Sequence, residues 1–421
     1  MILTEEEKKM IGGDYGPGVQ KCMKLLEQWG ELFGAERMIR VNHVHVSTSF
    51  PTKAVIELSE GTNRVRTLSS LHAVYDPKYW REKFGVILKR LGGGYGTPDE
   101  GEFEKRMSLL RKLNFLPTFT CAPYCIGIFP KPGDVLCLTG SSGQVISNSL
   151  FGARAGRESV ATCFAAAITG RTPLMGLLKK ENRFAEVLVK IGTELDPTIL
   201  NEADYGALGY YIGEVAGHKN VAIEGLPEDI SFEYGRSLLS PLPVSGACVL
   251  CHIIGVSPEA HTLEEVLEKR KPDVITVDKK EISSSYEKLH NATDGREVDM
   301  VAIGCPHLTI SEIGELASLL HGKKVNQNVR LVIGISRPSY VLAKDCGYAD
   351  IIETAGAIVV NSCVGPLNPF VFLEEGANAG AATNSARAAH YIQRMSAGKT
   401  KTFYGDLRKC IKAAINGRWE E

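Results

Sequence analysis

The chain has 421 residues, of which 44% are hydrophobic and 23% charged, and its formal net charge is −1. This length exceeds the roughly 100–200 residues of one domain, so we expect two or three lobes. Nucleic acid is not an expected partner, because its binding depends on dense Lys and Arg, and the sequence has no such run.

The N-terminus and the apolar segments argue against secretion and against a membrane partner. The first ten residues, MILTEEEKKM, are acidic and polar, whereas a secretory signal has a basic start and an apolar core. The longest apolar stretch, residues 244–256, is interrupted by Ser245 and His252 and is shorter than the ~18 residues of a membrane span. We therefore expect a soluble, cytoplasmic protein whose cysteines are free thiols, metal ligands or both.

The first third of the chain mixes helix and strand patterns. Apolar spacing predicts helices over residues 21–33 and 102–113. Residues 92–98 between them read GGGYGTP, a glycine-rich loop. This loop lacks the Lys-Ser/Thr of a nucleotide-binding P-loop and any preceding strand, so we expect no nucleotide there.

The last third has the clearest pattern, in which apolar strands alternate with helices. Strands are predicted over residues 298–304, 329–335, 357–360 and 381–383, and helices over residues 311–320, 340–346 and 386–391. Thr309 and Glu312 have capping-box spacing at one helix start. The alternation predicts an α/β fold with a parallel sheet, which binds ligands beyond the carboxyl ends of its strands. The reactive residues of this segment follow those ends: Cys305, Ser336, Arg337, Cys363, Asn384 and Ser385.

Most of the eleven cysteines have the setting of core residues. Cys248 and Cys251 form a CxxC, but they lie in an apolar, strand-like run in which residues three apart point to opposite faces. We therefore favour a structural role for this pair. Core packing is also predicted for the cysteines inside apolar or helical patterns: Cys22, Cys137, Cys163, Cys346 and Cys410.

Three other cysteines differ in context. Cys121 lies in a proline-broken loop, and Cys305 and Cys363 terminate predicted strands. Their separations match no short metal motif, and Cys125 is a competing candidate. Spacing alone therefore leaves a metal site undecided.

Eight longer stretches carry a more specific pattern. They are TCAPY (120–124), SNSLFGAR (147–154), AAAITGRTP (165–173), ENR (181–183), DYGALGYYIG (204–213), AIGCPHLTISEI (302–313), SRPSYVLAKDCGYADIIETAG (336–356) and ATNSARAAHY (382–391). Together they resemble the large subunit of the aconitase X family of dehydratases. The resemblance implies several aconitase-like α/β/α lobes with mostly parallel sheets and a catalytic crevice between lobes. We expect an N-terminal lobe over residues 1–200, a middle lobe over 201–295 and a C-terminal lobe over 296–421.

The resemblance implies an iron centre with Cys121, Cys305 and Cys363 as its three thiolate ligands. A [4Fe-4S] cluster is the first choice, with a [2Fe-2S] cluster or a single iron as alternatives. Four thiolates would saturate a cluster for electron transfer, whereas three leave one iron with an open position. That iron can act as a Lewis acid on a substrate hydroxyl that leaves as water.

The family also implies the substrate and the residues around it. Its members dehydrate phosphomevalonate (mevalonate 5-phosphate) to anhydromevalonate phosphate, or cis-3-hydroxy-L-proline, and the ENR and GALGYYIG segments favour the first. The proton to be removed lies beside a carboxylate, whose charge must be neutralised. Arg337 is the strongest candidate for this, because Arg grips carboxylates bidentately. Catalytic roles are implied for Ser336, Arg337, Asn384 and Ser385, and substrate binding for Ser141, Ser142, Asn148, Arg154, Arg157, His307 and Thr383.

Departures from the family pattern alter the predicted pocket. Gly140 stands where the family usually has Glu, and Ala155 and Gly156 replace its usual Thr and Asn. The missing carboxylate favours a rival of another class, an iron–sulfur binding or sensing protein that has lost catalysis. The retained Ser336, Arg337 and Asn384 favour the enzyme.

The resemblance further implies a small partner subunit. Enzymes of the aconitase superfamily take their proton-abstracting serine from a separate swivelling domain. Only about thirty residues follow the last predicted helix, too few for a further domain. We therefore expect a small swivel-domain subunit that supplies the serine base for a hydroxy-acid substrate. The alternative is a self-sufficient chain whose base is His307 or Ser385.

Overall fold

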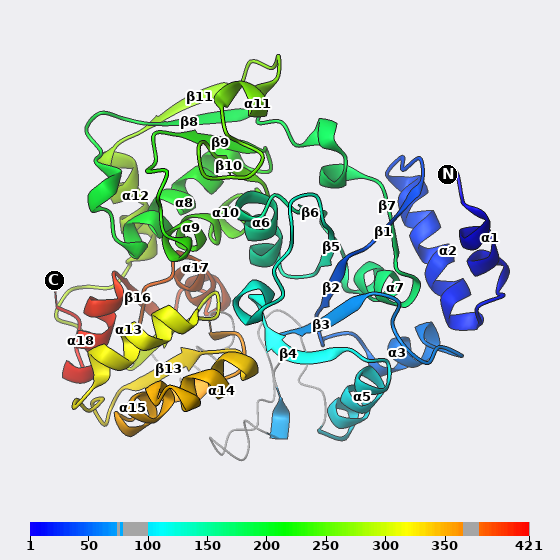
Figure 1. Ribbon diagram of the computed structural model, residues 1–421. Coiled ribbons are helices and arrows are strands. Elements are labelled where there is room, and N and C mark those ends of the chain that lie inside the picture. The colour runs from blue at the N-terminus through cyan, green and yellow to red at the C-terminus, as the bar shows by residue number, and fades with distance from the viewer. Residues whose placement is uncertain (74–75, 79–99, 365–378, 421) are drawn as a thin grey trace.

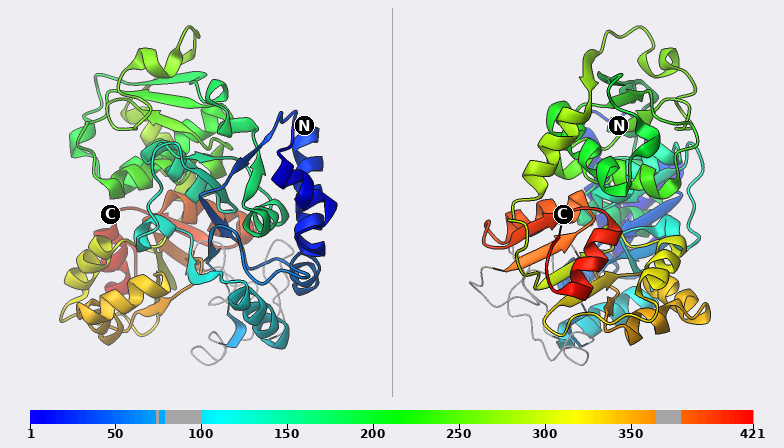
Figure 2. Two further views of the ribbon diagram at one scale, coloured as in Figure 1. Left: turned by 45° about the vertical axis from the view of Figure 1, so that its right-hand side comes forward. Right: turned by 90° about the vertical axis from the view of Figure 1, so that its left-hand side faces the viewer.

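The computed structural model describes residues 1–73, 76–78, 100–364 and 379–420. The described chain forms three lobes, each built on its own parallel sheet (Figure 1). The N-terminal lobe lies at the right, the middle lobe at the top and the C-terminal lobe at the lower left, and Figure 2 shows them from two further sides. The predicted α/β class with mostly parallel sheets is confirmed.

The N-terminal lobe contains a five-stranded sheet in the order β4-β3-β2-β5-β6. Its strands are β2 (His43–Val46), β3 (Leu68–His72), β4 (Leu116–Thr120), β5 (Val135–Leu138) and β6 (Arg154–Ala155), and β1 (Met38–Arg40) pairs antiparallel with β7 (Arg171–Pro173). Its helices are α1 (Glu5–Gly12), α2 (Pro17–Leu32), α3 (Thr52–Leu58), α5 (Glu100–Lys112), α6 (Ser141–Leu150) and α7 (Val160–Thr169). Helices α2 and α5 confirm two predicted helices. The glycine-rich loop at residues 92–98 lies outside the described residues.

The middle lobe contains a four-stranded sheet in the order β10-β9-β8-β11. Its strands are β8 (Val187–Ile191), β9 (Val221–Glu224), β10 (Cys251–Ile253) and β11 (Asp273–Val277). Its helices are α8 (Glu202–Ala216), α9 (Phe232–Leu239), α10 (Leu242–Ser245), α11 (Leu263–Leu267) and α12 (Lys279–Leu289). Because β8 belongs to this sheet, we propose to place the first lobe boundary before Val187 rather than near residue 200.

The C-terminal lobe contains a five-stranded sheet in the order β14-β13-β12-β15-β16. Its strands are β12 (Met300–Ile303), β13 (Arg330–Gly334), β14 (Ile358–Val360), β15 (Gly380–Thr383) and β16 (Lys401–Tyr404). Its helices are α13 (Ile310–Leu320), α14 (Arg337–Asp345), α15 (Tyr348–Thr354), α17 (Ala386–Met395) and α18 (Leu407–Asn416). The predicted elements of this third are confirmed with shifts of a few residues, and the capping box of Thr309 and Glu312 is present.

All three sheets share one winding order. In each, the first three parallel strands step outward, and the chain then returns to add the next strand on the other side of the first. The returns create switch points between β2 and β5, between β8 and β11, and between β12 and β15. Open parallel sheets bind ligands beyond their carboxyl ends at such points. The fold therefore directs attention to the residues after β12 and β15.

Helix α8 approaches its neighbours closely because glycines line its contact faces. A side-chain carbon on Gly209 would overlap the carbonyl oxygen of Leu238 in α9. One on Gly206 would lie 2.5 Å from the hydroxyl of Tyr404 in β16. The DYGALGYYIG stretch is therefore a packing surface that joins the middle lobe to the C-terminal lobe.

The structure tests the predicted core cysteines. Six are buried as predicted, namely Cys22, Cys137, Cys163, Cys248, Cys251 and Cys410. The prediction for Cys346 is wrong, because α14 ends at Asp345 and the Cys346 thiol is exposed at its C-terminal cap. Within the described ranges, the helices are too short or too polar to cross a membrane.

Candidate active site

Three cysteines from two lobes meet beyond the ends of parallel strands. Cys121 directly follows β4, Cys305 follows β12 and Cys363 follows β14. The Cys363 thiol donates a hydrogen bond to Cys121, and the charge of Cys305 acts on Cys363. The backbone N–H of His307 donates to Sγ of Cys121 over 3.2 Å. The N-terminal and C-terminal lobes therefore share one sulfur-rich site.

The surroundings of Cys121 favour its thiolate. The hydrogen bond from Cys363 is the largest influence on the pKa of Cys121, and it lowers this pKa well below its usual range despite burial. The same hydrogen bond, together with burial, raises the pKa of Cys363. Burial raises the pKa of Cys125, the competing candidate, to about 11. Because the thiolate is the form that binds metal, Cys121 is better prepared as a ligand than Cys125.

Arg387, in the first turn of α17, is a partly buried cation that acts on all three thiols. Burial alone would lower its pKa, but Tyr391 and the three cysteines outweigh this and raise it. Its Nη2 donates to the hydroxyls of Ser141 and Tyr391, each over 3.1 Å, and its Nη1 donates to the Ser240 carbonyl over 3.1 Å. Arg387 was not among the site residues expected from the sequence. Its signal was a position in the ATNSARAAHY stretch, just inside a helix that follows a buried strand.

The first turn of α6 forms one wall of the site. Ser141 contacts Arg387, and a side-chain carbon on Gly143 would lie 3.8 Å from the carbonyl oxygen of Cys121. His72, the last residue of β3, lies against Gly140. Burial is the main cause that lowers the pKa of His72, and the charge of Cys121 opposes it. His72 was also missed, and no motif in the sequence marks it.

The predicted residues after β15 gather at the switch point. Ser385 donates its hydroxyl to the carbonyl of Cys305, and Thr383 Oγ1 accepts from the Ser385 N–H over 3.2 Å. The Asn384 side chain hydrogen-bonds to Glu202 of the middle lobe. These three residues line a small hollow or support it, together with Cys305.

The loop after β12 is anchored from two sides. His307 is buried, and its Nε2 donates to the Ser362 carbonyl over 3.0 Å. Arg236 in α9 donates to the His307 carbonyl over 2.7 Å and to Glu312 over 2.9 Å. The middle lobe therefore fixes the position of the loop that carries Cys305.

Ser336 and Arg337 lie at the start of α14. Ser336 caps this helix, and its hydroxyl donates to Ser339 Oγ over 2.7 Å. Arg337 pairs with Asp76 of the N-terminal lobe over 3.2 Å, and its guanidinium carbon lies 4.2 Å from the centre of the Phe119 ring. Phe119 lies in β4, shortly before Cys121, so Arg337 spans the two lobes beside the thiols.

Other predicted substrate-binding residues have different surroundings. Asn148 uses its amide on backbone groups and on Arg183, which leaves it no donor or acceptor for a ligand. Arg154 donates to a backbone carbonyl, and Arg157 is exposed. Among the described contacts, none joins these residues to the three cysteines. Ser142 is buried beside Ser141 in α6.

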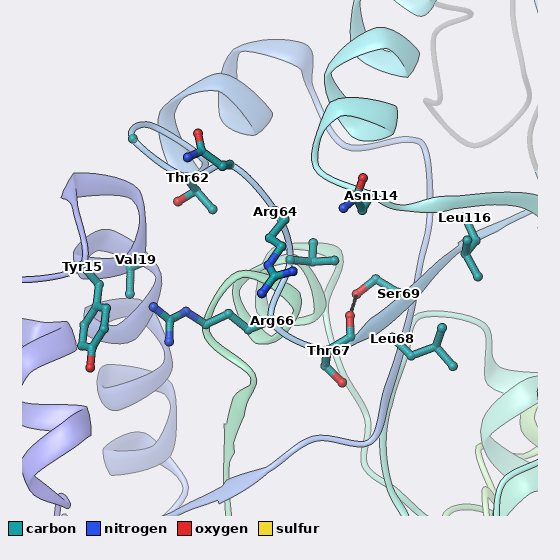
Figure 3. A pocket seen from close by; sticks show the side chains of 13 residues that line it. Tyr15, Val19, Thr62, Arg64, Arg66, Thr67, Leu68, Ser69, Asn114 and Leu116 are labelled. Carbon is teal, nitrogen blue, oxygen red and sulfur yellow. Dashed lines mark hydrogen bonds between the residues drawn. The ribbon is translucent and has the colours of Figure 1, made fainter.

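A wide surface hollow of about 800 Å³ lies away from the cysteines (Figure 3). Leu68 and Leu116, which begin β3 and β4, lie in its wall, so it sits at the amino ends of these strands. Arg66 lines it from a loop and stacks over Tyr15 at 4.5 Å. Because open parallel sheets bind ligands at their carboxyl ends, we assign the chemistry to the cysteine site.

Models of three consecutive protein-family domains match the chain. They are described as the first, second and third domains of aconitase X, and they match residues 1–181, 185–287 and 298–416. These spans correspond to the three sheets described above.

Known proteins of similar sequence and structure span nearly the whole chain. The chain is 31% identical to the phosphomevalonate dehydratase large subunit of Methanocaldococcus jannaschii, over 98% of this chain and 100% of that protein. It is 27% identical to the cis-3-hydroxy-L-proline dehydratase of Hypocrea jecorina, over 99% of this chain and 69% of that protein. The crystal structure of Thermococcus kodakaraensis aconitase X in its holo-form matches with a TM-score of 0.81 at 29% identity, covering 98% of this chain and 100% of that one.

Proposed function

Because the chain belongs to the aconitase X family, we propose that it dehydrates mevalonate 5-phosphate to anhydromevalonate phosphate as the large subunit of a two-subunit enzyme. Membership makes it a dehydratase, a carbon–oxygen lyase. The observation that carries the proposal is the meeting of Cys121, Cys305 and Cys363 beside the partly buried cation Arg387. Such a site combines metal-binding thiols with a fixed positive charge for an anionic substrate.

The extent of the similarity supports phosphomevalonate over the alternative. The chain spans the whole of a phosphomevalonate dehydratase large subunit, but 69% of a cis-3-hydroxy-L-proline dehydratase. The latter substrate remains the second candidate, since that relative also covers nearly all of this chain. A non-catalytic iron–sulfur binding or sensing protein is the rival that Gly140 suggested from the sequence, and membership of a dehydratase family argues against it.

The residues at the site fit an iron centre. Buried polar atoms beside the cysteines make no hydrogen bond within the described chain: Nδ1 of His307, Oγ of Ser362 and Oδ1 of Asn361. No group of three His, Cys, Asp or Glu side chains in the described ranges is arranged to hold a single metal ion. In a cluster, the thiolates bind different irons and need not converge on one point. We therefore retain a [4Fe-4S] cluster as first choice and a [2Fe-2S] cluster as second, and a single iron fits least well.

Cys121, Cys305 and Cys363 would hold this centre, which when bound supplies a Lewis acid to the departing hydroxyl. The chain's own residues serve the rest of the substrate. We assign Arg337 to the substrate carboxylate, with the backbone and side-chain donors around Thr383, Asn384 and Ser385 at the other side of the site. Arg387 adds positive charge and orients Ser141.

The proton-abstracting group is proposed to come from the partner subunit. The hydroxyls of Ser336 and Ser385 already donate to Ser339 and to the Cys305 carbonyl. A serine that is committed as a donor within its own lobe is poorly placed to take a proton from substrate. These two residues therefore hold loops in position.

The iron centre is tested by single substitutions. Purified without oxygen, Cys121→Ser, Cys305→Ser and Cys363→Ser should each contain less iron and sulfide than the unaltered chain, because a ligand is lost. Cys346→Ser is the matched control, since this thiol is exposed at a helix end. Undiminished iron in any of the three variants would remove that residue from the ligand set.

Substrate turnover then separates the candidate functions. The iron-loaded chain with its partner should convert mevalonate 5-phosphate and release water. Conversion of cis-3-hydroxy-L-proline alone would establish the second candidate. Full iron content without turnover of either compound would favour the non-catalytic protein.

A further inference from the structure

The absence of a side chain at Gly140 is explained by the neighbouring His72 ring. The backbone conformation of Gly140 does not itself require glycine. Its φ of −89° and ψ of 118° are open to any residue. A side-chain carbon here would lie 2.8 Å from Nε2 and 3.0 Å from Cδ2 of His72. The first distance is shorter than any normal packing contact. The glycine therefore leaves the space that the His72 ring occupies.

The His72 ring is held in one orientation. Its centre lies 5.4 Å from the ring centre of His45, which is itself fixed by Ser70 over 2.7 Å and by the Thr120 carbonyl over 2.8 Å. Nδ1 of His72 lies 3.3 Å from the carbonyl oxygen of Ala73. A carbonyl only accepts hydrogen bonds, so we infer that Nδ1 carries the hydrogen and that Nε2 of the neutral ring is an acceptor.

This acceptor lies within the cysteine site. Nε2 faces Gly140 at the start of α6, and the next residue, Ser141, binds Arg387. Electrostatic interactions with Cys121, His307 and Arg387 also reach the ring. His72 is partly exposed, and its Nε2 accepts no hydrogen bond from the described residues. Among the described residues, this fixed acceptor has no donor, and it is therefore offered to a ligand that enters the site.

We propose that His72 contacts the substrate, that its Nε2 accepts a hydrogen bond from a substrate hydroxyl, and that Gly140 is the matching residue that makes room for it. This proposal rests on the proposed dehydratase function. In this proposal, His72 contributes a neutral hydrogen-bond acceptor to the cysteine site. The pocket then recognises a substrate hydroxyl through His72, for which Gly140 leaves the space.

The contact is tested with the iron-loaded chain assembled with its partner and with mevalonate 5-phosphate and cis-3-hydroxy-L-proline as probes. In His72→Ala, KM should rise roughly 2- to 12-fold for the compound that is turned over, which corresponds to one lost neutral hydrogen bond. Iron content and kcat should stay near the unaltered values. His72→Gln, whose amide oxygen reaches toward the position of Nε2, should recover most of the loss. His261→Ala, at an exposed histidine, is the control and should change nothing.

A double-mutant cycle tests the pairing with Gly140. Gly140→Ala should raise KM in the unaltered chain because it displaces the ring, but it should have no further effect in His72→Ala. Gly12→Ala, where the nearest atom lies 3.7 Å away, is the matched glycine control. Independent effects of the two substitutions on KM and on the unfolding temperature would refute the shared space.

The outcomes distinguish this proposal from the proposed function. Normal KM in His72→Ala, or a loss of iron in that variant, would overturn the substrate contact while leaving the dehydratase intact. Absence of turnover in the unaltered assembly would instead overturn the proposed function and, with it, the substrate contact of His72. The unfolding-temperature cycle would still decide whether residues 72 and 140 share one space.

Discussion

Two roles are proposed for Arg337. Its guanidinium joins the C-terminal lobe to the N-terminal lobe, and it is assigned to the substrate carboxylate. It pairs with Asp76 and stacks on Phe119, and both contacts use the planar fork. Arg337→Lys keeps the charge but loses this geometry. If Arg337 binds the substrate carboxylate, kcat/KM should fall roughly 10- to 150-fold, as expected for one charged hydrogen bond, while iron content stays unchanged.

The control for this variant is Arg408→Lys, at an exposed arginine with a long 3.7 Å contact to Glu315. It should behave as the unaltered chain does. Near-normal kinetics in Arg337→Lys, measured with the partner present, would leave Arg337 as a tie between lobes and not a substrate ligand.

Glu158 gives the fold a pH dependence of its own. Its carboxylate oxygens are buried, and burial raises the pKa of Glu158 to about 7 against the smaller, opposite effect of Thr162. The unfolded chain releases this proton near pH 4.5, so folding must retain a proton, or bury a charge, above that pH. The free energy of unfolding should therefore fall between about pH 4.5 and 7, by about 3 kcal/mol in all, and level off above.

Glu158→Gln removes the titration and imitates the protonated acid. This variant should match the unaltered chain near pH 4.5 and be more stable at pH 8, as measured by denaturant unfolding at both values. Glu104→Gln, at an exposed glutamate, should show no such difference. Equal stability of Glu158→Gln and the unaltered chain at pH 8 would contradict the assignment.

At the residue scale, the sequence was informative where a side chain follows a strand. Cys121, Cys305 and Cys363 were selected by that context and by family resemblance, and the structure places them together. Arg387 and His72 were not predicted as site residues, because their roles arise from contacts across lobes or strands. The reason for glycine at position 140 could not be predicted from the sequence, because it depends on the neighbouring His72 ring.

At the scale of elements, buried strands were the most predictable feature. Strands β12, β13 and β15 are covered on both faces, so their sequences are nearly continuous apolar runs. The setting of Cys346 was not predictable, because helix ends vary by one or two residues and its exposure depends on where α14 stops. Helix α8 shows the converse, since its glycines were noted only as a family motif and prove to be packing contacts.

The close contacts at the glycines of α8 predict an effect on stability opposite to the one expected from helix propensity. Gly209→Ala should favour the isolated helix, because Ala is the better helix former by about 1 kcal/mol. The added carbon would, however, overlap the Leu238 carbonyl of α9, and overpacking of this kind costs typically 1–3 kcal/mol or more. We expect a net loss of stability in thermal unfolding, whereas Gly12→Ala at the end of α1, where the nearest atom lies at an ordinary contact distance of 3.7 Å, should not be destabilised in this way. A Gly209→Ala variant as stable as the unaltered chain would show that α8 and α9 can separate at no cost.

At the scale of the whole molecule, the sequence indicated several α/β lobes. It did not indicate that their sheets share one strand order. The three sheets repeat one winding order, yet no internal repeat is visible along the chain. Winding order is set by how crossovers pack and not by particular residues, so it can recur without sequence similarity. The consequence is functional, because the carboxyl edges of two such sheets face each other and place Cys121 opposite Cys305 and Cys363.

A partner subunit is the last expectation, and it concerns the assembly. This chain spans 100% of the Methanocaldococcus jannaschii phosphomevalonate dehydratase, which is named a large subunit. It spans 69% of the Hypocrea jecorina cis-3-hydroxy-L-proline dehydratase, which is not named a subunit. The remainder of the longer protein corresponds in our proposal to a separate small subunit here. Without it the crevice would stay open to water, and the serine base would be missing.

The chain should therefore be nearly inactive alone and gain at least roughly 100-fold in turnover with its partner, the lower range expected for a positioned general base. The measurement compares mevalonate 5-phosphate dehydration by the iron-loaded chain alone and after mixing with the candidate small subunit, with the assembly mass determined in both. Glu104→Gln, at an exposed glutamate, is a control that should respond to the partner normally. Full turnover by the isolated chain, with no partner detected by mass, would show that one of its own residues, such as His307 or Ser385, takes the proton.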